Sequence, residues 1–174
     1  MKSITILAVA GIAAAATAQG VTLTFSADRT SAVVGDNIGW TVSASFTGFP
    51  DATAYYGGYV GTFDASDAGL GTANQLTNLM AGTGTPATAN GASVETINIF
   101  NAALLGTNDN ANPIDIFTFS VLANPGAGAL SYSAGGVNTV FPNDNIFTLG
   151  EEFTATVVSD TVNIVPAPGA LALL

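Results

Sequence analysis

Residues 38–46 read Ile38-Gly39-Trp40-Thr41-Val42-Ser43-Ala44-Ser45-Phe46, so apolar side chains alternate with small or hydroxyl-bearing ones. A period of two sends successive side chains to opposite faces of a β-strand, and a half-buried strand is the structure that this pattern favours. The stretch therefore predicts a strand with one apolar face, in which Trp40 belongs to the core and does not serve as an exposed platform.

The same alternation recurs along the rest of the chain. Further strands are predicted at about residues 21–26, 55–63, 94–100, 114–122, 130–133, 137–141 and 153–165. Clusters of turn residues separate them at positions 35–37, 106–113, 124–128, 135–136 and 142–145. Residues 64–93 are rich in Gly, Ala, Thr and Asn, and predict a long surface connection with a short helical turn near residues 75–80.

These signals predict an all-β fold. Helical periodicity does not extend beyond about two turns anywhere after residue 18, and β-branched and aromatic residues are punctuated by Gly, Pro and Asn. About eight to nine antiparallel strands at this spacing indicate a two-sheet β-sandwich, of Ig-like, cohesin-like or jelly-roll type. A closed barrel would give the same signal, so the topology stays open.

The first residues have the features of a secretory signal peptide. Lys2 supplies a positive start, residues 4–16 are apolar, and Ala16-Thr17-Ala18 is a small-x-small cleavage signal. The alternative is a membrane anchor, but the apolar run is shorter than the roughly 20 residues that span a bilayer. We expect residues 1–18 to be the signal peptide, with cleavage after Ala18, and residues 19–165 to form a single sandwich domain.

Composition excludes several functions. The chain has two basic and twelve acidic residues, and removal of Lys2 leaves Arg29 as the single cation. Such a protein repels the phosphate backbone, so nucleic-acid binding is excluded. Cysteine is absent, so strand pairing and the core must stabilise the fold without disulfides. Histidine is absent too, which removes the commonest general base and the commonest ligand of transition metals.

Catalysis by a nucleophile is not expected, because residues 19–174 offer no His, Cys or Lys to activate one. A glycoside hydrolase needs only two suitably spaced carboxylates, and the candidates are Glu95, Glu151 and Glu152. Glu151 and Glu152 follow Gly150 in an apparent turn, where a solvated acidic pair is the ordinary interpretation. We therefore predict that the protein is not an enzyme and has no catalytic residues.

Calcium is the best-motivated cofactor among those considered, because Asp, Asn and backbone oxygens are the ligands that hard cations take. Two loops qualify by composition, but neither has the spacing of an EF-hand: Asn108, Asp109, Asn110, Asn112 and Asp115 in the first, and Asn143, Asp144 and Asn145 in the second. Asn and Asp are also standard turn formers, so the sequence assigns no metal ligands and no cofactor.

Carbohydrate binding would require exposed aromatic rings. Tyr55, Tyr56 and Tyr59 form the only local aromatic cluster, beside Gly57 and Gly58. Strand alternation places Tyr55 and Tyr59 on one face and Tyr56 on the other. One set is then predicted to pack in the core, and at most the other is exposed.

The last residues resemble a bacterial sorting signal. Pro166-Ala167-Pro168 after Val165 is similar to the Val-Pro-Glu-Pro-like motif of PEP-CTERM proteins, with Ala167 in place of the usual Glu. The resemblance implies processing by an exosortase at Pro166 and Pro168, and delivery to the cell surface or extracellular matrix. In that family a transmembrane helix and a basic cluster follow; only six residues follow Pro168, so we expect the chain to continue past Leu174 and to meet the membrane only through that missing helix.

The body resembles the cohesin-like sandwiches of such exported proteins, in segments such as residues 116–121, which read Ile-Phe-Thr-Phe-Ser-Val. Three functions follow as alternatives. The first is a non-enzymatic surface or matrix protein with a structural or adhesive role. The second is a module that binds a surface polysaccharide or a protein, with or without calcium. The third, a carboxylate-only glycoside hydrolase, ranks lowest.

Overall fold

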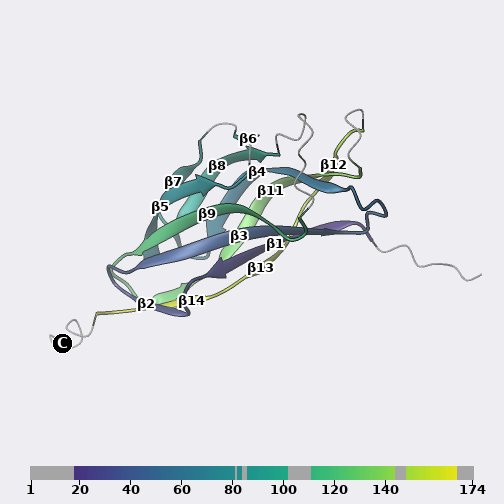
Figure 1. Cartoon of the computed structure of the whole chain (residues 1–174). Coiled ribbons are helices and arrows are strands. Elements are labelled where there is room, and N and C mark those ends of the chain that lie inside the picture. Colours follow the sequence, from purple (N-terminus) through teal and green to yellow (C-terminus); the bar gives the residue numbers. More distant parts are fainter. Residues whose placement is uncertain (1–17, 81, 84–85, 102–110, 144–147, 168–174) are drawn as a thin grey trace, which may run out of the picture.

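The computed structural model describes residues 18–80, 82–83, 86–101, 111–143 and 148–167, and they form a sandwich of two β-sheets (Figure 1). One sheet has five strands, in the order β13 (Thr156–Ser159), β1 (Gly20–Ala27), β3 (Asn37–Thr47), β9 (Ile114–Ala123) and β5 (Gly71–Asn78). No α-helix occurs in these ranges; one 3-10 turn, η1 (Ala68–Leu70), leads into β5. The predicted all-β sandwich is confirmed.

The second sheet has six strands. Their order is β12 (Glu151–Phe153), β11 (Tyr132–Phe141), β4 (Tyr55–Ala65), β8 (Ser93–Phe100) and β6 (Gly82–Thr83), with β7 (Thr88–Asn90) also paired to β8. A third, small sheet closes one end of the sandwich with β10 (Gly128–Leu130), β14 (Val162–Val165) and β2 (Ser31–Val33). In Figure 1, β2 and β14 lie side by side at that end.

The core consists of the inward side chains of the two large sheets, as the alternation in β3 predicts. Ile38, Trp40, Val42, Ala44 and Phe46 are all buried, and Trp40 is 1% exposed. Rings meet across the gap between the sheets: Trp40 lies edge-on to Tyr132 of β11 with ring centroids 4.8 Å apart. The interpretation of Trp40 as a core residue is confirmed.

One buried polar pair belongs to this core. The hydroxyl of Tyr56 in β4 donates a 2.6 Å hydrogen bond to Oδ1 of Asn138 in β11, and both residues are almost fully buried. Nδ2 of Asn138 donates to the carbonyl of Phe153 in β12. A buried amide is costly without partners, so this pair satisfies both groups and connects three strands of the six-stranded sheet.

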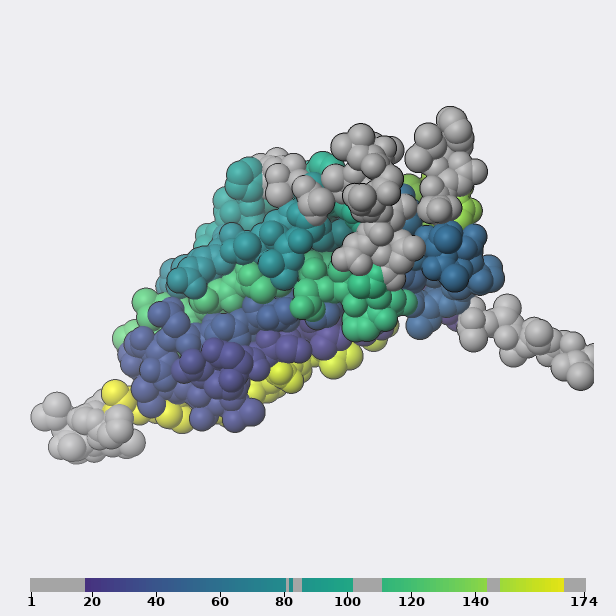
Figure 2. All heavy atoms as spheres, in the orientation of Figure 1, coloured from purple at the N-terminus to yellow at the C-terminus, as the bar shows by residue number. Residues whose placement is uncertain are grey.

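Two expectations about strand pairing are wrong. The strands are not all antiparallel, because β1 runs parallel to β13 and β2 runs parallel to β14. Figure 2 shows the consequence, with the N-terminal segment in purple beside the C-terminal segment in yellow. The described part of the chain also holds β1 to β14, more strands than the eight or nine expected, because several pairings involve only two to four residues.

The segment 64–93 is not the long connection that its composition suggested. It contains η1, β5, β6 and β7, and the helical turn expected near residues 75–80 falls largely in strand β5. Strand β5 is hard to predict from the sequence because most of its residues are small or polar, with few large apolar side chains. At Gly71, an added Cβ would collide with the side chain of Val121 in β9, so a glycine is what the packing permits there.

Two predicted boundaries are also wrong. Gly135-Gly136 is not a turn, because β11 runs unbroken from Tyr132 to Phe141. The strand expected over residues 153–165 is divided into β12, β13 and β14, which pair with three different sheets. A change of sheet occurs at Asp160, where the side chain accepts a hydrogen bond from the backbone N–H of Ala27.

Candidate functional site

The three glutamates singled out for catalysis do not form a site. Glu95 lies in β8, where it accepts a 2.6 Å hydrogen bond from Nδ2 of Asn90. Glu151 and Glu152 lie in strand β12, not in the expected turn. Strands β11 and β4 separate β12 from β8, so the backbones are about 14 Å apart at the usual interstrand spacing. The carboxylate pairs of glycosidases are closer, at about 5–9.5 Å.

The described residues of the two candidate calcium loops have structural partners. Asn112 accepts from the N–H of Phe46 and donates to its carbonyl, so its side chain continues the backbone pairing of β3. Asp115 accepts a 2.6 Å hydrogen bond from the hydroxyl of Ser43. Thr148 donates to Oδ1 of Asn143. Asn108, Asp109, Asn110, Asp144 and Asn145 lie outside the described residues.

Within the ranges that the structure describes, no three Asp, Glu, His or Cys side chains are grouped closely enough to hold a metal ion.

The tyrosine cluster is not an exposed aromatic platform. Tyr55, Tyr56 and Tyr59 are all buried, so the packing in the core predicted for one set extends to all three. The strict alternation fails at Gly58, whose φ of +150° and neighbouring register shift bring both Tyr56 and Tyr59 into the core. Burial raises the pKa of both phenols above its ordinary value. These tyrosines stabilise the sandwich.

An apolar patch lies on the outer face of the six-stranded sheet. Val60 of β4 and Val137 of β11 are direct neighbours in the register, and they are 57% and 41% exposed. Phe100 of β8, 46% exposed, projects from the adjacent strand opposite Gly58. We call Val60, Val137 and Phe100 the outer apolar patch. Clustered apolar side chains on a sheet face, in contrast to single exposed ones, are typical of a binding surface.

Polar groups border this patch. On β4, two residues beyond Val60, the hydroxyl of Thr62 donates a 3.0 Å hydrogen bond to the exposed carboxylate of Asp64. On β8, Asn98 stands opposite Val60 in the register. An apolar centre with a polar border is the usual composition of a protein-protein interface.

Sequence reasoning missed this patch, although a signal for it was present. Val60 falls in the solvent-facing phase of a strand whose inward phase is occupied by Tyr59 and Phe63. Val137 does the same in β11, next to the buried Asn138. When each of two paired strands carries an apolar residue at a position that faces solvent, the pair predicts an exposed apolar face. The prediction requires that the pairing is known.

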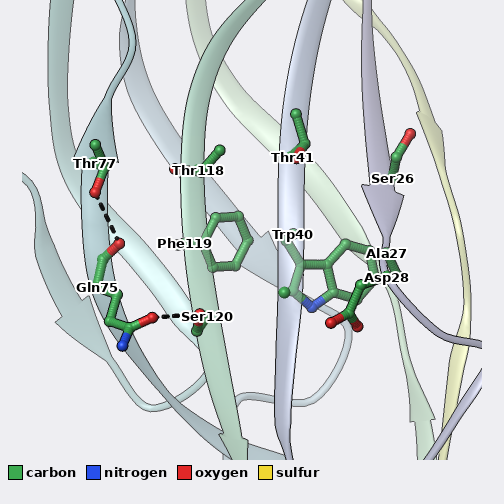
Figure 3. A pocket seen from close by; sticks show the side chains of 11 residues that line it. Ser26, Ala27, Asp28, Trp40, Thr41, Gln75, Thr77, Thr118, Phe119 and Ser120 are labelled. Carbon is green, nitrogen blue, oxygen red and sulfur yellow. Dashed lines mark hydrogen bonds between the residues drawn. The ribbon is translucent and has the colours of Figure 1, made fainter.

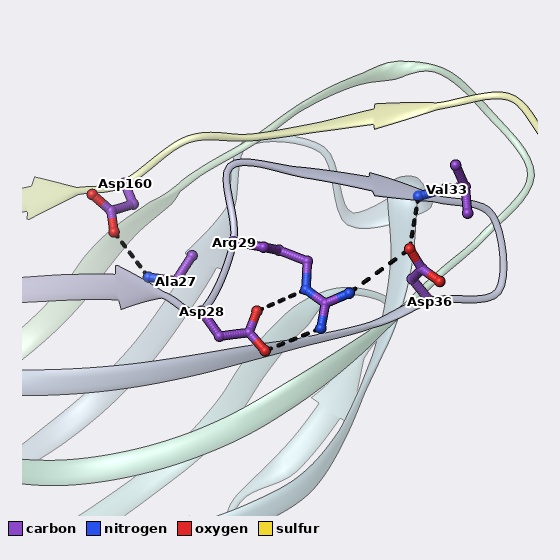
Figure 4. Close-up of polar contacts among 6 residues, drawn as sticks. All are labelled: Ala27, Asp28, Arg29, Val33, Asp36 and Asp160. Carbon is purple, nitrogen blue, oxygen red and sulfur yellow. Dashed lines mark hydrogen bonds and ion pairs between the residues drawn. The ribbon is translucent and has the colours of Figure 1, made fainter.

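The only arginine of the chain is part of a structural cluster (Figure 4). Nε and Nη2 of Arg29 donate to the two carboxylate oxygens of Asp28 at 2.9 and 3.2 Å, and Nη1 lies 3.8 Å from Asp36. Arg29 holds the pKa of Asp28 below its usual range, and Asp28 in turn raises the pKa of Arg29. Asp36 also accepts from the N–H of Val33, so the cluster fixes the turn around β2.

The residues expected to be processed lie at the two ends of the described fold. Ala18 is exposed and lies two residues before the start of β1, and Pro166 is exposed directly after β14. Pro168 lies outside the described residues. Among the residues that the structure describes, we find no helix with the length and apolarity that crossing a bilayer requires.

No protein-family model matches the chain, and no curated protein sequence matches it. Solved structures do match, and several of them are cohesin modules. The seventh type I cohesin of ScaB from Pseudobacteroides cellulosolvens aligns at a TM-score of 0.57 with 12% identity, covering 85% of this chain and 94% of that one. The cohesin module of a family 33 glycoside hydrolase from Clostridium perfringens gives 0.57 and 13%, covering 86% and 100%.

A third similar structure is a type I cohesin–dockerin complex from Clostridium thermocellum. The matched chain aligns at a TM-score of 0.54 with 16% identity, over 83% of this chain and 99% of its own length. At such identities the likeness establishes the fold and nothing finer. The described sandwich therefore has a cohesin-like fold, and the resemblance of its body to cohesins is confirmed.

Proposed function

We propose that this protein is an exported, non-enzymatic recognition module that binds a protein partner through the outer apolar patch. The observation that carries the proposal is the pairing of the exposed Val60 with the exposed Val137 on the outer face of the six-stranded sheet, bordered by Thr62 and Asp64. The cohesin-like fold supports it, because one of the similar structures was solved as a complex with a dockerin.

The partner that suits this surface has an apolar centre and basic groups around it. The side chains of two adjacent valines on paired strands form no hydrogen bonds, so affinity would come from removing apolar area from water. Asp64 at the border, and the excess of acidic residues overall, would steer a basic surface toward the patch. A structural or adhesive role at the cell surface is compatible with such binding.

The test begins with a photo-crosslinking residue placed at Val137 and, as a matched control, at Thr24 on the outer face of the five-stranded sheet. We expect a specific adduct from the surface proteins of the native host at position 137 and none at position 24. The captured protein is then purified and its Kd is measured by calorimetry.

Val60→Glu should weaken this binding at least about 30-fold, because an unpaired carboxylate would be desolvated at the centre of the interface. Thr24→Glu should leave the Kd within about two-fold. Val60 is exposed, so the variant keeps its fold, which circular dichroism verifies. Equal crosslinking at both positions, or a Kd that Val60→Glu leaves unchanged, would remove the proposal.

We also infer that the protein is exported and sorted. Support comes from the sequence: the signal-like residues 1–18, and Pro166 and Pro168 of the PEP-CTERM-like motif. N-terminal sequencing of the exported protein should give Gln19 as the first residue, whereas retention of Met1 would contradict export. A reading frame that continues past Leu174 into about 20 apolar residues closed by arginines would support exosortase processing.

A further inference from the structure

A hollow of about 430 Å³ lies on the outer face of the five-stranded sheet, on the opposite side of the sandwich from the outer apolar patch. Its lining residues come from β1, β3, β5 and β9, with Asp28 directly after β1 (Figure 3). Six of them carry a hydroxyl or an amide: Ser26, Thr41, Gln75, Thr77, Thr118 and Ser120. Six of the eleven lining residues therefore offer neutral hydrogen-bonding groups.

Strand register explains this concentration of hydroxyls. Ser26 of β1 stands opposite Thr41 of β3, Thr41 opposite Thr118 of β9, and Thr118 opposite Thr77 of β5. One hydroxyl from each of four strands thus forms a row across the sheet, with about 4.8 Å from one strand to the next. Among the described residues, the hydroxyls of Ser26, Thr41 and Thr118 make no hydrogen bond to protein.

The depth of the hollow comes from a missing side chain. Beside Ser120 of β9, the paired position in β3 is Gly39. A Cβ built on Gly39 would lie 3.2 Å from Oδ2 of Asp28, so even a small side chain there would crowd the hollow. Glycine inside a strand often marks a place where another group approaches the backbone closely.

Gln75 forms one wall in a strained conformation. Its φ is +51°, in the left-handed region, and the pairing of β5 with β9 shifts between Asn74 and Thr77. Its Oε1 accepts a 3.0 Å hydrogen bond from Ser120, and its carbonyl accepts from Thr77, as Figure 3 shows. Strained residues that are held by neighbours concentrate at ligand sites. Two amide N–H donors of Gln75 remain for a ligand.

From these features we infer that the hollow binds a neutral saccharide of one or two units. Uncommitted hydroxyls and an amide in a concave surface match the alternating donors and acceptors of a sugar ring. Asp28 is already paired with Arg29, so the lining carries no unpaired charge. Anionic ligands would meet a protein of charge −10, and apolar ligands would leave the hydroxyls unsatisfied.

The same geometry sets the affinity. Trp40 and Phe119 contribute to the lining, but their rings are buried in the core and cannot stack on a sugar. Binding by hydrogen bonds alone, in competition with water, yields little net free energy per bond. A Kd in the millimolar range is therefore expected, and multiple copies of the module on one polysaccharide would be needed for tight attachment.

The test is an NMR titration of the 15N-labelled domain with cellobiose, maltose, xylobiose and N,N′-diacetylchitobiose. At least one should cause saturable shifts of backbone amides around Ser26, Thr41, Gln75 and Thr118 at about millimolar concentrations. Digalacturonate, the anionic probe, should cause none. Absence of saturable shifts with all four neutral sugars at about 50 mM, or shifts centred on Val60 and Val137, would overturn the inference.

Variants locate the site. Thr118→Val removes one hydroxyl with little change in shape and should raise the Kd at least about five-fold, and Gly39→Ser should abolish binding by filling the hollow. Thr24→Val, on the same face but outside the hollow, is the matched control and should change nothing. Val60→Glu should leave the chemical-shift changes caused by the saccharide intact. The protein-binding proposal and the saccharide-binding proposal can therefore be tested separately.

Discussion

Replacing Phe63 by alanine should lower the free energy of unfolding by about 3–5 kcal/mol, the largest loss that we expect from a single truncation in this domain. Phe63 is fully buried in β4 and its ring touches rings from both sheets. It lies edge-on to Phe25 of β1 at 5.0 Å and to Phe117 of β9 at 5.7 Å, and it stacks on Tyr59 at 5.2 Å.

The size of this effect follows from the position of the ring. Phe63 fills the gap between the sheets where β1 and β9 face β4, so its removal leaves a cavity that two stiff sheets cannot close. Without a disulfide in the chain, no covalent link compensates. For a domain with the usual total stability of about 5–15 kcal/mol, the loss would unfold a substantial fraction on modest warming.

Urea denaturation followed by tryptophan fluorescence measures this change, because Trp40 is the single tryptophan and is buried in the same core. The matched control is Phe100→Ala, which deletes an equal ring that is about half exposed and should cost about 1 kcal/mol or less. If both variants lost similar amounts, the central position assigned to Phe63 would be wrong.

The sequence specifies the fold class well, because alternation is a local signal. Trp40 and its neighbours in β3 are placed in the core by period alone, and Tyr55 to Ala65 forms a strand close to its predicted bounds. What alternation cannot specify is the partner of a strand. Residues 153–157 and 162–164 each alternate, yet the segment 153–165 contributes to three sheets in succession, because pairing is decided by distant residues such as Ala27 and Asp160.

The candidate sites were harder to predict than the fold. The glutamates, the Asn-rich loops and the tyrosines are conspicuous as residue types in the sequence, but their roles depend on which strands are neighbours. Glu95 and Glu151 can be excluded as a catalytic pair only once β11 and β4 are known to lie between their strands. The row from Ser26 to Thr77 has no local signature at all, since its members come from four strands that only register brings together.

Glycines show the same limit most clearly. A Gly-Gly pair ordinarily predicts a turn, but Gly136 lies inside β11, directly opposite Gly61 of β4. The paired glycines leave room for Tyr59, whose hydroxyl donates a 2.7 Å hydrogen bond to the carbonyl of Thr62. A Cβ on Gly61 would lie 2.6 Å from that hydroxyl and 2.7 Å from Cα of Gly136.

Gly61→Ala should therefore destabilise the domain by about 3 kcal/mol, although alanine is the smallest possible addition. The new methyl would also meet the carbonyl oxygen of Gly135, a backbone atom in a paired strand that cannot move aside as a flexible side chain would. The free energy of unfolding in urea measures the loss.

The control for this prediction is Gly20→Ala at the start of β1, where an added Cβ meets nothing within 4 Å. That variant should change stability by no more than about 0.5 kcal/mol, and any gain would come from a less flexible unfolded chain. Since both variants make the same chemical change, their difference isolates the close approach of β4 and β11. Equal stabilities for the two would mean that these strands can separate locally, and that the sheet face carrying Val60 and Val137 is not held rigidly for binding.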